Sequence, residues 1–199
     1  MKRVYSVIGL EEAMRLVPAE RLTPWELMAE PQPPSDTMRD YLQRLRVFDL
    51  DNSEAAKLLL IDALFAEIVP NHSPLKVWKA MALETDTLTG IADYVFPPDY
   101  VYLKTPLLCV AEAKRDDFAQ GRAQCIAEMT ACDWKNRQQG IEIDVYGIVS
   151  NGQGWVFYKL TTTKSVYETV LYSISDLPKL LGAINAVCAE CARNARRHE

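Results

Sequence analysis

The stretch Leu107-Leu-Cys-Val-Ala-Glu-Ala-Lys114 decides the fold of this chain. Its first seven residues are almost wholly apolar, which is typical of a short central strand buried on both faces. The next segment, from Asp116 to about Lys135, carries apolar residues at helical spacing, and Val145 to Val149 again has the pattern of a strand. A strand, a helix and a second strand in this order predict a right-handed crossover between parallel strands.

Other segments extend this unit into a sheet with helices on it. A helix is expected at 54–69, because Asn52-Ser53 can cap its start and Pro70 ends it. Strands are expected at 75–83, 88–96, 155–160 and 166–174, and a helix from 175–176 to about 196. The turn-forming residues 150–154 join two of the strands as a hairpin. The predicted fold class is therefore α/β, a mixed central β-sheet flanked by helices.

The first 50 residues have a different character. Short helices are expected at 10–17 and 37–48, and a stiff, proline-rich loop at 30–34 separates them. We divide the chain into an N-terminal helical extension, residues 1–50, and an α/β domain, residues 51–199. The extension resembles an appendage or a lid, and its helices are candidates for contact with a second copy of the chain or with another protein.

Composition excludes several classes of protein. The chain has 199 residues, of which 49% are hydrophobic and 25% charged, the balance of an ordinary globular domain. Its net charge of -5 does not indicate a polyanion partner. No apolar run is long enough to cross a membrane, and Glu11 and Glu12 interrupt what would be a signal peptide, so we expect a cytoplasmic protein.

Cysteine usage agrees with a reducing compartment. Five cysteines form an odd set without the spacing of a disulfide framework, which predicts free thiols. Cys188 and Cys191 form a C-x-x-C pair within a helical pattern, but no second pair accompanies them to complete a zinc site.

Three charged residues stand out as candidates for chemistry: Asp93, Glu112 and Lys114. Residues i and i+2 of a strand share a face, so Glu112 and Lys114 project together from an apolar strand. Burial of charge is costly unless a partner or a metal compensates it. If the strand of Asp93 pairs with 107–113, both carboxylates and the carbonyl oxygen of Ala113 form an all-oxygen site that suits Mg²⁺ or Mn²⁺.

Such a site predicts phosphodiester hydrolysis. A bound Mg²⁺ or Mn²⁺ would polarise the phosphate and lower the pKa of a bound water. Lys114 would orient or deprotonate that water and offset negative charge in the transition state. A solvated strand end or a structural ion pair between Glu112 and Lys114 is the alternative interpretation.

This set of residues resembles the PD-(D/E)xK nuclease superfamily. Asp93 in Gly90-Ile-Ala-Asp-Tyr-Val-Phe96 is followed 19 positions later by Glu112-Ala-Lys114. The stretch from Glu54 to about Leu160 is most similar to the nuclease domains of type I restriction endonuclease subunits. The resemblance implies a restriction endonuclease-like sandwich and a Mg²⁺-dependent endonuclease that hydrolyses DNA.

The resemblance also implies two further site residues. A glutamate on the first core helix maps to Glu54, and a glutamine on the helix after Glu-x-Lys maps to Gln124. A favourable interaction with the helix dipole would equally explain a glutamate at position 54, at the start of the helix. Glu67 is the alternative site glutamate, because it lies in the apolar sector of the same predicted helix. An exposed helical glutamine needs no special explanation, so Gln124 depends on the resemblance.

The chain departs from the family pattern in three places. Ala92 stands where a proline often precedes the aspartate, and Glu128 follows Gln124 where some branches have a tyrosine. The first 50 residues have no counterpart in the family.

Two other functions stay open at this point. The first is a non-catalytic interaction or assembly protein that retains the nuclease-like fold, which the net charge of -5 favours. The second is a metal-dependent hydrolase of small phosphate compounds. Trp78, Trp134 and Trp155 are candidates for base stacking, although tryptophans at apolar spacing more often belong to a core.

Overall fold

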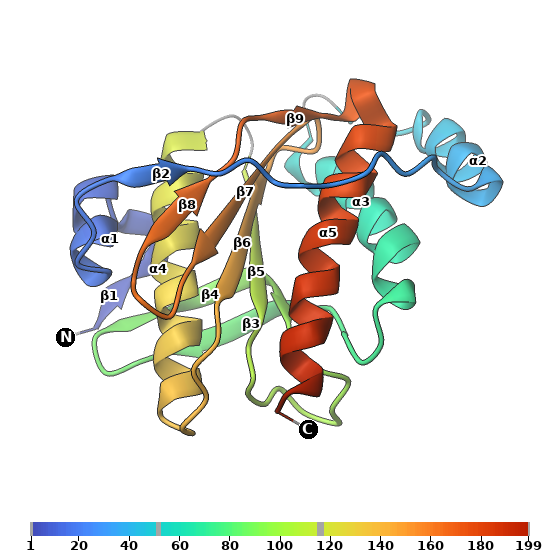
Figure 1. Ribbon diagram of the computed structural model, residues 1–199. Coiled ribbons are helices and arrows are strands. Elements are labelled where there is room, and N and C mark those ends of the chain that lie inside the picture. Colours follow the sequence, from blue (N-terminus) through green and yellow to red (C-terminus); the bar gives the residue numbers. More distant parts are fainter. Residues whose placement is uncertain (1, 51–52, 115–117, 199) are drawn as a thin grey trace.

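Nine strands form one mixed sheet in the computed structural model, which describes residues 2–50, 53–114 and 118–198, and of Glu54 the backbone alone (Figure 1). The strands are β1 Arg3–Val4, β2 Leu22–Pro24, β3 Trp78–Glu84, β4 Leu88–Phe96, β5 Cys109–Ala113, β6 Val145–Ser150, β7 Gly154–Leu160, β8 Val166–Glu168 and β9 Tyr172–Ser173. Their order is β1-β4-β5-β6-β7-β8-β2, with β3 also paired to β4 and β9 to β7.

The predicted parallel crossover is confirmed. β5 and β6 are parallel neighbours, and the chain passes between them through α4, described as Phe118–Arg137. The expected start of this helix at Asp116 lies outside the described residues. β4 pairs with β5, and β6 with β7, in the antiparallel sense, so the sheet is mixed as expected.

Helices cover both faces of the sheet. They are α1 Leu10–Leu16, α2 Asp36–Leu45, α3 Glu54–Ile68, α4 and α5 Leu177–Arg196, with short 3-10 turns at Tyr5–Val7, Val69–Asn71 and Ile174–Asp176. One core lies between the sheet and α3 and α5, and the second lies between the sheet and α4 and α1 (Figure 1). Strand β5 is buried along its whole length because it contributes to both cores: Cys109 and Ala111 to the first, Val110 to the second.

Serine side chains cap the starts of two helices. The hydroxyl of Ser35 accepts from the Met38 N–H at 3.1 Å at the start of α2, and Ser53 accepts from Ala56 at 3.2 Å at the start of α3. Helix α2 ends earlier than expected, at Leu45, and the chain then turns.

The N-terminal segment contributes to the sheet, which the sequence did not predict. β1 pairs in parallel with β4, and β2 pairs in parallel with β8. Strands of two or three residues are too short to show an alternating pattern, so only the paired sheet reveals them. The expected edge strand 166–174 is likewise split into β8 and β9, with residues 169–171 between them.

The segment between β2 and α2 crosses α5 (Figure 1). It is fixed there by a hydrogen bond from the Gln32 N–H to the carbonyl oxygen of Pro178, at 2.8 Å. The two backbones approach closely at Gly182, where a Cβ would overlap the carbonyl oxygen of Glu30. Residues 25–35 therefore form a strap over α5.

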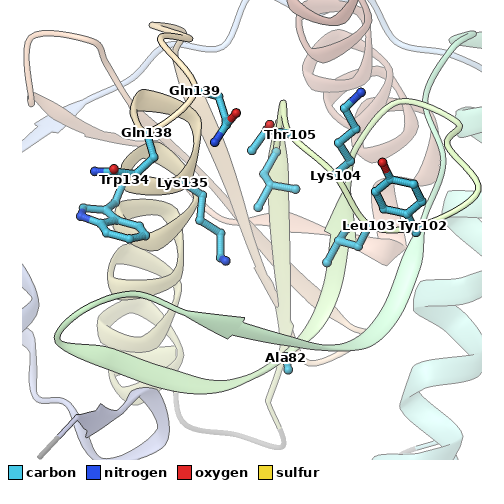
Figure 2. A pocket seen from close by; sticks show the side chains of 10 residues that line it. Ala82, Tyr102, Leu103, Lys104, Thr105, Trp134, Lys135, Gln138 and Gln139 are labelled. Atoms are coloured by element: carbon cyan, nitrogen blue, oxygen red, sulfur yellow. The ribbon is translucent and has the colours of Figure 1, made fainter.

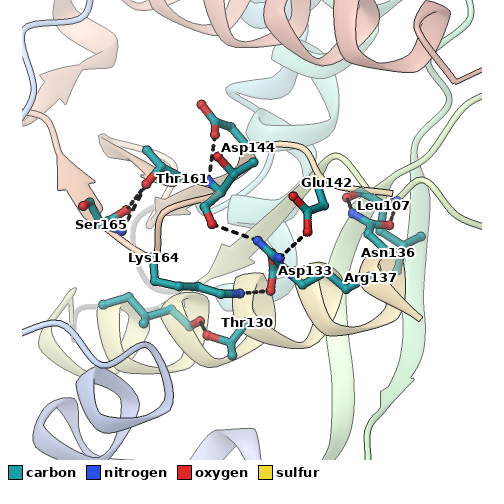
Figure 3. A network of polar contacts seen from close by, with 12 residues as sticks. Leu107, Thr130, Asp133, Asn136, Arg137, Glu142, Asp144, Thr161, Lys164 and Ser165 are labelled. Atoms are coloured by element: carbon teal, nitrogen blue, oxygen red, sulfur yellow. Dashed lines mark hydrogen bonds and ion pairs between the residues drawn. The ribbon is translucent and has the colours of Figure 1, made fainter. Parts of the chain in front are cut away.

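A polar network fixes the C-terminal end of α4 (Figure 3). The buried Asp133 carboxylate accepts from Arg137 Nε at 3.0 Å and from Lys164 Nζ, and Arg137 also donates to the carbonyl of Thr162 at 2.8 Å. The amide of Asn136 makes two hydrogen bonds of 2.8 Å with the backbone of Leu107. These contacts join α4 to the β7–β8 turn and to the chain just before β5.

All five cysteines are buried free thiols, as predicted. Among the described residues, no helix combines the length and the apolar character required to cross a membrane.

Candidate functional site

Asp93 and Glu112 face each other on the two central strands β4 and β5. The antiparallel ladder pairs Tyr94 with Ala111, and one step further along the same register places Asp93 opposite Glu112. Directly opposite residues of an antiparallel pair project from the same face. This is the face of Val95 and Val110, which pack in the α4 core.

The sheet ladder is interrupted at Asp93 on both sides. Toward β5, the Asp93 carboxylate takes the place of a backbone acceptor, because its Oδ2 accepts from the Ala113 N–H at 2.8 Å. Toward β3, the residue in register with Asp93 is Ala80, which has a φ of 51° and is skipped in the ladder. An alanine in the left-handed region is strained, and such strain is concentrated at functional sites.

Glu112 is a buried carboxylate with a lysine beside it. Its side chain is 2% exposed, and its Oε1 lies 2.6 Å from Lys114 Nζ. The Lys114 N–H donates to the carbonyl of Ser150 at 2.8 Å, which fixes the end of β5 against β6. The prediction that these two side chains share a face is confirmed.

Helix α4 adds Gln124 and Glu128 to this pair. Lys114 Nζ donates to Gln124 Oε1 at 2.9 Å, and Gln124 Nε2 donates to Glu128 Oε1 at 3.0 Å. Gln124 is therefore a buried link between the strand lysine and a fully buried glutamate, and not an exposed helical residue.

The glycine at the start of α4 gives Lys114 its room. A Cβ on Gly121 would lie 2.7 Å from Val149 Cγ1 and 2.9 Å from Lys114 Cγ. Because position 121 has no side chain, the lysine stem passes between the helix and the sheet to reach Gln124.

Burial and mutual repulsion perturb the acids of this cluster. Desolvation and the nearby Asp93 charge raise the pKa of Glu112 to about 7, although Lys114 opposes the change. Desolvation and the charge of Glu112 raise the pKa of Glu128 well above its ordinary value. Burial beside Glu112 thus favours the neutral form of Glu128.

The two candidate helix glutamates stand differently. The side chain of Glu54 lies outside the described residues, although its backbone starts α3. Glu67 is engaged elsewhere: its two carboxylate oxygens accept from the Ser35 N–H at 2.8 Å and from the Ser35 hydroxyl at 2.9 Å. Glu67 therefore fixes the start of α2.

Sequence reasoning missed two buried charged residues near this end of the sheet. The sequence indicated Glu128 only as a departure from the family pattern. Because it follows Gln124 by four residues on one helix, its side chain is expected to lie next to that of Gln124. Lys57 on α3 is only 5% exposed. It lies beside the β6–β7 turn, since a Cβ added to Gly152 would be 3.5 Å from the Cβ of Lys57. Since α3 is apolar on most sides, its lysine could have been flagged as a buried charge.

The donor set suits a hard divalent cation. With the acids ionised, Glu112 Oε2 is a buried oxygen without a hydrogen-bond partner in the described chain. No group of three or more His, Cys, Asp or Glu side chains suited to a metal ion occurs among the described residues. The predicted site contains two carboxylates, of Asp93 and Glu112, with the Ala113 carbonyl, and oxygen donors of this kind are those that Mg²⁺ and Mn²⁺ prefer.

Trp155 is fully buried, and its Nε1 donates to the Gly152 carbonyl at 3.2 Å, which assigns it to the core. Trp78 and Trp134 are partly exposed.

Comparison with known proteins adds no assignment: no protein-family model matches the chain, and no curated protein matches its sequence significantly.

Proposed function

We propose that this protein is a metal-dependent nuclease that hydrolyses DNA phosphodiester bonds, with its site at Asp93, Glu112, Lys114 and Gln124. The observation that carries the proposal is the opposed pair Asp93 and Glu112 at an interruption of the central ladder, with Lys114 hydrogen-bonded beside it. In this proposal the fold is a restriction endonuclease-like sandwich.

Asp93, Glu112 and the Ala113 carbonyl would hold Mg²⁺ or Mn²⁺. Once bound, the ion supplies Lewis-acid activation of the phosphate and of a water molecule. Glu54 at the start of α3 is a further candidate ligand.

The protein's own groups position the nucleophile. The Lys114 ammonium group donates one N–H to Glu112 and one to Gln124. Its third N–H can therefore donate to a water molecule or a phosphate oxygen. The positive charge of Lys114 offsets charge that develops on the phosphate during attack. Gln124 keeps the lysine in place because its own amide is fixed by Glu128.

Cleavage of plasmid and single-stranded DNA with Mg²⁺ or Mn²⁺ tests this proposal. The Lys114→Ala variant should cleave at least about 100-fold more slowly, because it loses the positioning and charge of the ammonium group. Lys76→Ala, which removes an exposed lysine paired with Asp99, is the matched control and should keep the wild-type rate.

Calorimetric titration with Mn²⁺ separates binding from catalysis. Asp93→Asn and Glu112→Gln should lose Mn²⁺ affinity, whereas Lys114→Ala should retain it. Wild-type protein that binds no Mn²⁺ and leaves every DNA substrate intact would contradict the proposal and favour the non-catalytic interaction protein.

A further inference from the structure

A polar cavity lies away from the carboxylate cluster, between the end of α4 and the loop before β5 (Figure 2). Its volume is about 530 Å³, within the range of small-molecule sites. Trp134 follows Gln124 by ten residues, which is roughly 15 Å along the helix axis. The two sites are therefore separate.

Several polar side chains line this cavity. Lys135 lies on the last turn of α4, Gln138 and Gln139 lie in the turn that follows this helix, and Thr105 lies in the loop before β5 (Figure 2). Within the described residues none of these four side chains makes a hydrogen bond or ion pair. Convergent polar groups without internal partners around one cavity are typical of a ligand site.

The charge of the lining is positive. Among the described residues, the lining includes Lys104 and Lys135 and no acidic side chain. Lys104 lies over the Tyr100 ring, 5.0 Å from its centroid. Glu84 interacts electrostatically with Lys135, but it does not line the cavity and its carboxylate is 3.1 Å from Lys2 Nζ. The cavity thus favours an anion although the protein as a whole is negative.

The lining also includes an aromatic surface. Trp134 is partly exposed at the cavity, and no hydrogen bond of its indole N–H is present in the described part of the chain. Trp134 and Lys135 both line the cavity, so it offers an aromatic ring and an ammonium group to one ligand. A ligand with a planar ring and a phosphate matches this pair, because bases stack on aromatic faces while ammonium groups bind phosphate.

We propose that this cavity binds a nucleoside monophosphate, with the phosphate at Lys135 and the base against Trp134. The amides of Gln138 and Gln139 can each donate and accept, as the edge of a nucleobase requires. A free mononucleotide and one nucleotide of a single strand share this chemistry. The site does not depend on the proposed nuclease activity.

Calorimetric titration in EDTA, with AMP, with adenosine and with a 5′-phosphorylated DNA pentamer, tests the proposal without turnover. AMP should bind and adenosine should bind more weakly. Binding of the pentamer alone would assign the cavity to a nucleotide within a strand. No binding of either phosphate ligand at millimolar concentration would overturn the proposal.

Two variants locate the binding. Lys135→Ala should weaken it about tenfold, because a charge-assisted hydrogen bond is lost. Lys179→Ala, which removes an exposed lysine on α5, should leave affinity unchanged. Trp134→Phe should abolish the ligand-induced quenching of tryptophan fluorescence while keeping a ring for stacking. Equal affinities of the two lysine variants, or quenching that persists in Trp134→Phe, would place any binding elsewhere.

Discussion

Glu112 experiences opposing electrostatic effects. Burial and Asp93 favour its neutral form, while Lys114 at 2.6 Å favours the carboxylate. The net result is a pKa of about 7 in the folded protein, raised from 4.5. Between these two values the folded state holds a proton that the unfolded chain has released, so the stability of the fold falls as the pH rises through this window.

Glu112→Gln should therefore change the pH dependence of stability. Measured by urea unfolding in EDTA, the free energy of unfolding of the variant relative to wild type should rise by about 3 kcal/mol from pH 4.5 to pH 7.5, because a neutral amide does not titrate. Glu20→Gln, at an exposed position, is the control. Parallel pH profiles for wild type and Glu112→Gln would contradict the assigned pKa.

Sequence periodicity identified part of this cluster. Glu112 and Lys114 share a face because the side-chain period of a strand is two, and the structure confirms this. Glu128 could not be found in this way, because its position next to Glu112 depends on how α4 lies across the sheet. Ala80 carries no signal at all, since alanine gives no indication of a positive φ.

At the level of the elements, the packing of the strap (residues 25–35) against helix α5 depends on one close approach of their backbones. Gly182 sits where a Cβ would overlap the Glu30 carbonyl oxygen and lie 3.0 Å from the carbonyl carbon. Backbone cannot rotate away as a flexible side chain can, so the strap must shift to admit any larger residue.

Gly182→Ala should destabilise the protein by about 2 kcal/mol, as overpacking does, although alanine is the better helix former. Urea unfolding measures this loss, and limited proteolysis should show faster cleavage within residues 25–35. Gly9→Ala is the steric control, because a Cβ there has no atom within 4 Å, and any loss is confined to the N-cap of α1 and leaves the proteolysis of residues 25–35 unchanged. Unchanged stability and proteolysis in Gly182→Ala would mean that the strap does not lie against α5.

Some elements could be predicted from the sequence and others could not, for a simple physical reason. Helix α3 and strand β5 are predictable because their own residues carry the signal: a serine cap and a long apolar segment in α3, and a short apolar run in β5. Strands β1 and β2 are not, because two or three residues become a strand only through pairing with β4 and β8. Their existence is a property of the assembled sheet.

At the level of the whole molecule, the first 50 residues complete both cores. Apolar side chains that are at most 3% exposed in this segment are Tyr5, Ile8, Ala13, Val17, Met38 and Leu45. At roughly 2 kcal/mol for each large side chain, their burial contributes on the order of 10 kcal/mol. That is comparable with the entire stability of a typical domain, about 5–15 kcal/mol.

A chain of residues 51–199 should therefore not fold cooperatively. It would expose the α4 core that Tyr5 and Ile8 cover, and it would leave the edges of β4 and β8 without their parallel partners. Circular dichroism during urea titration should show no sharp transition, whereas deletion of residues 197–199 should preserve one, because Arg197 and His198 are exposed. A sharp transition in the 51–199 chain would instead establish residues 1–50 as a separable extension, as their sequence alone indicates.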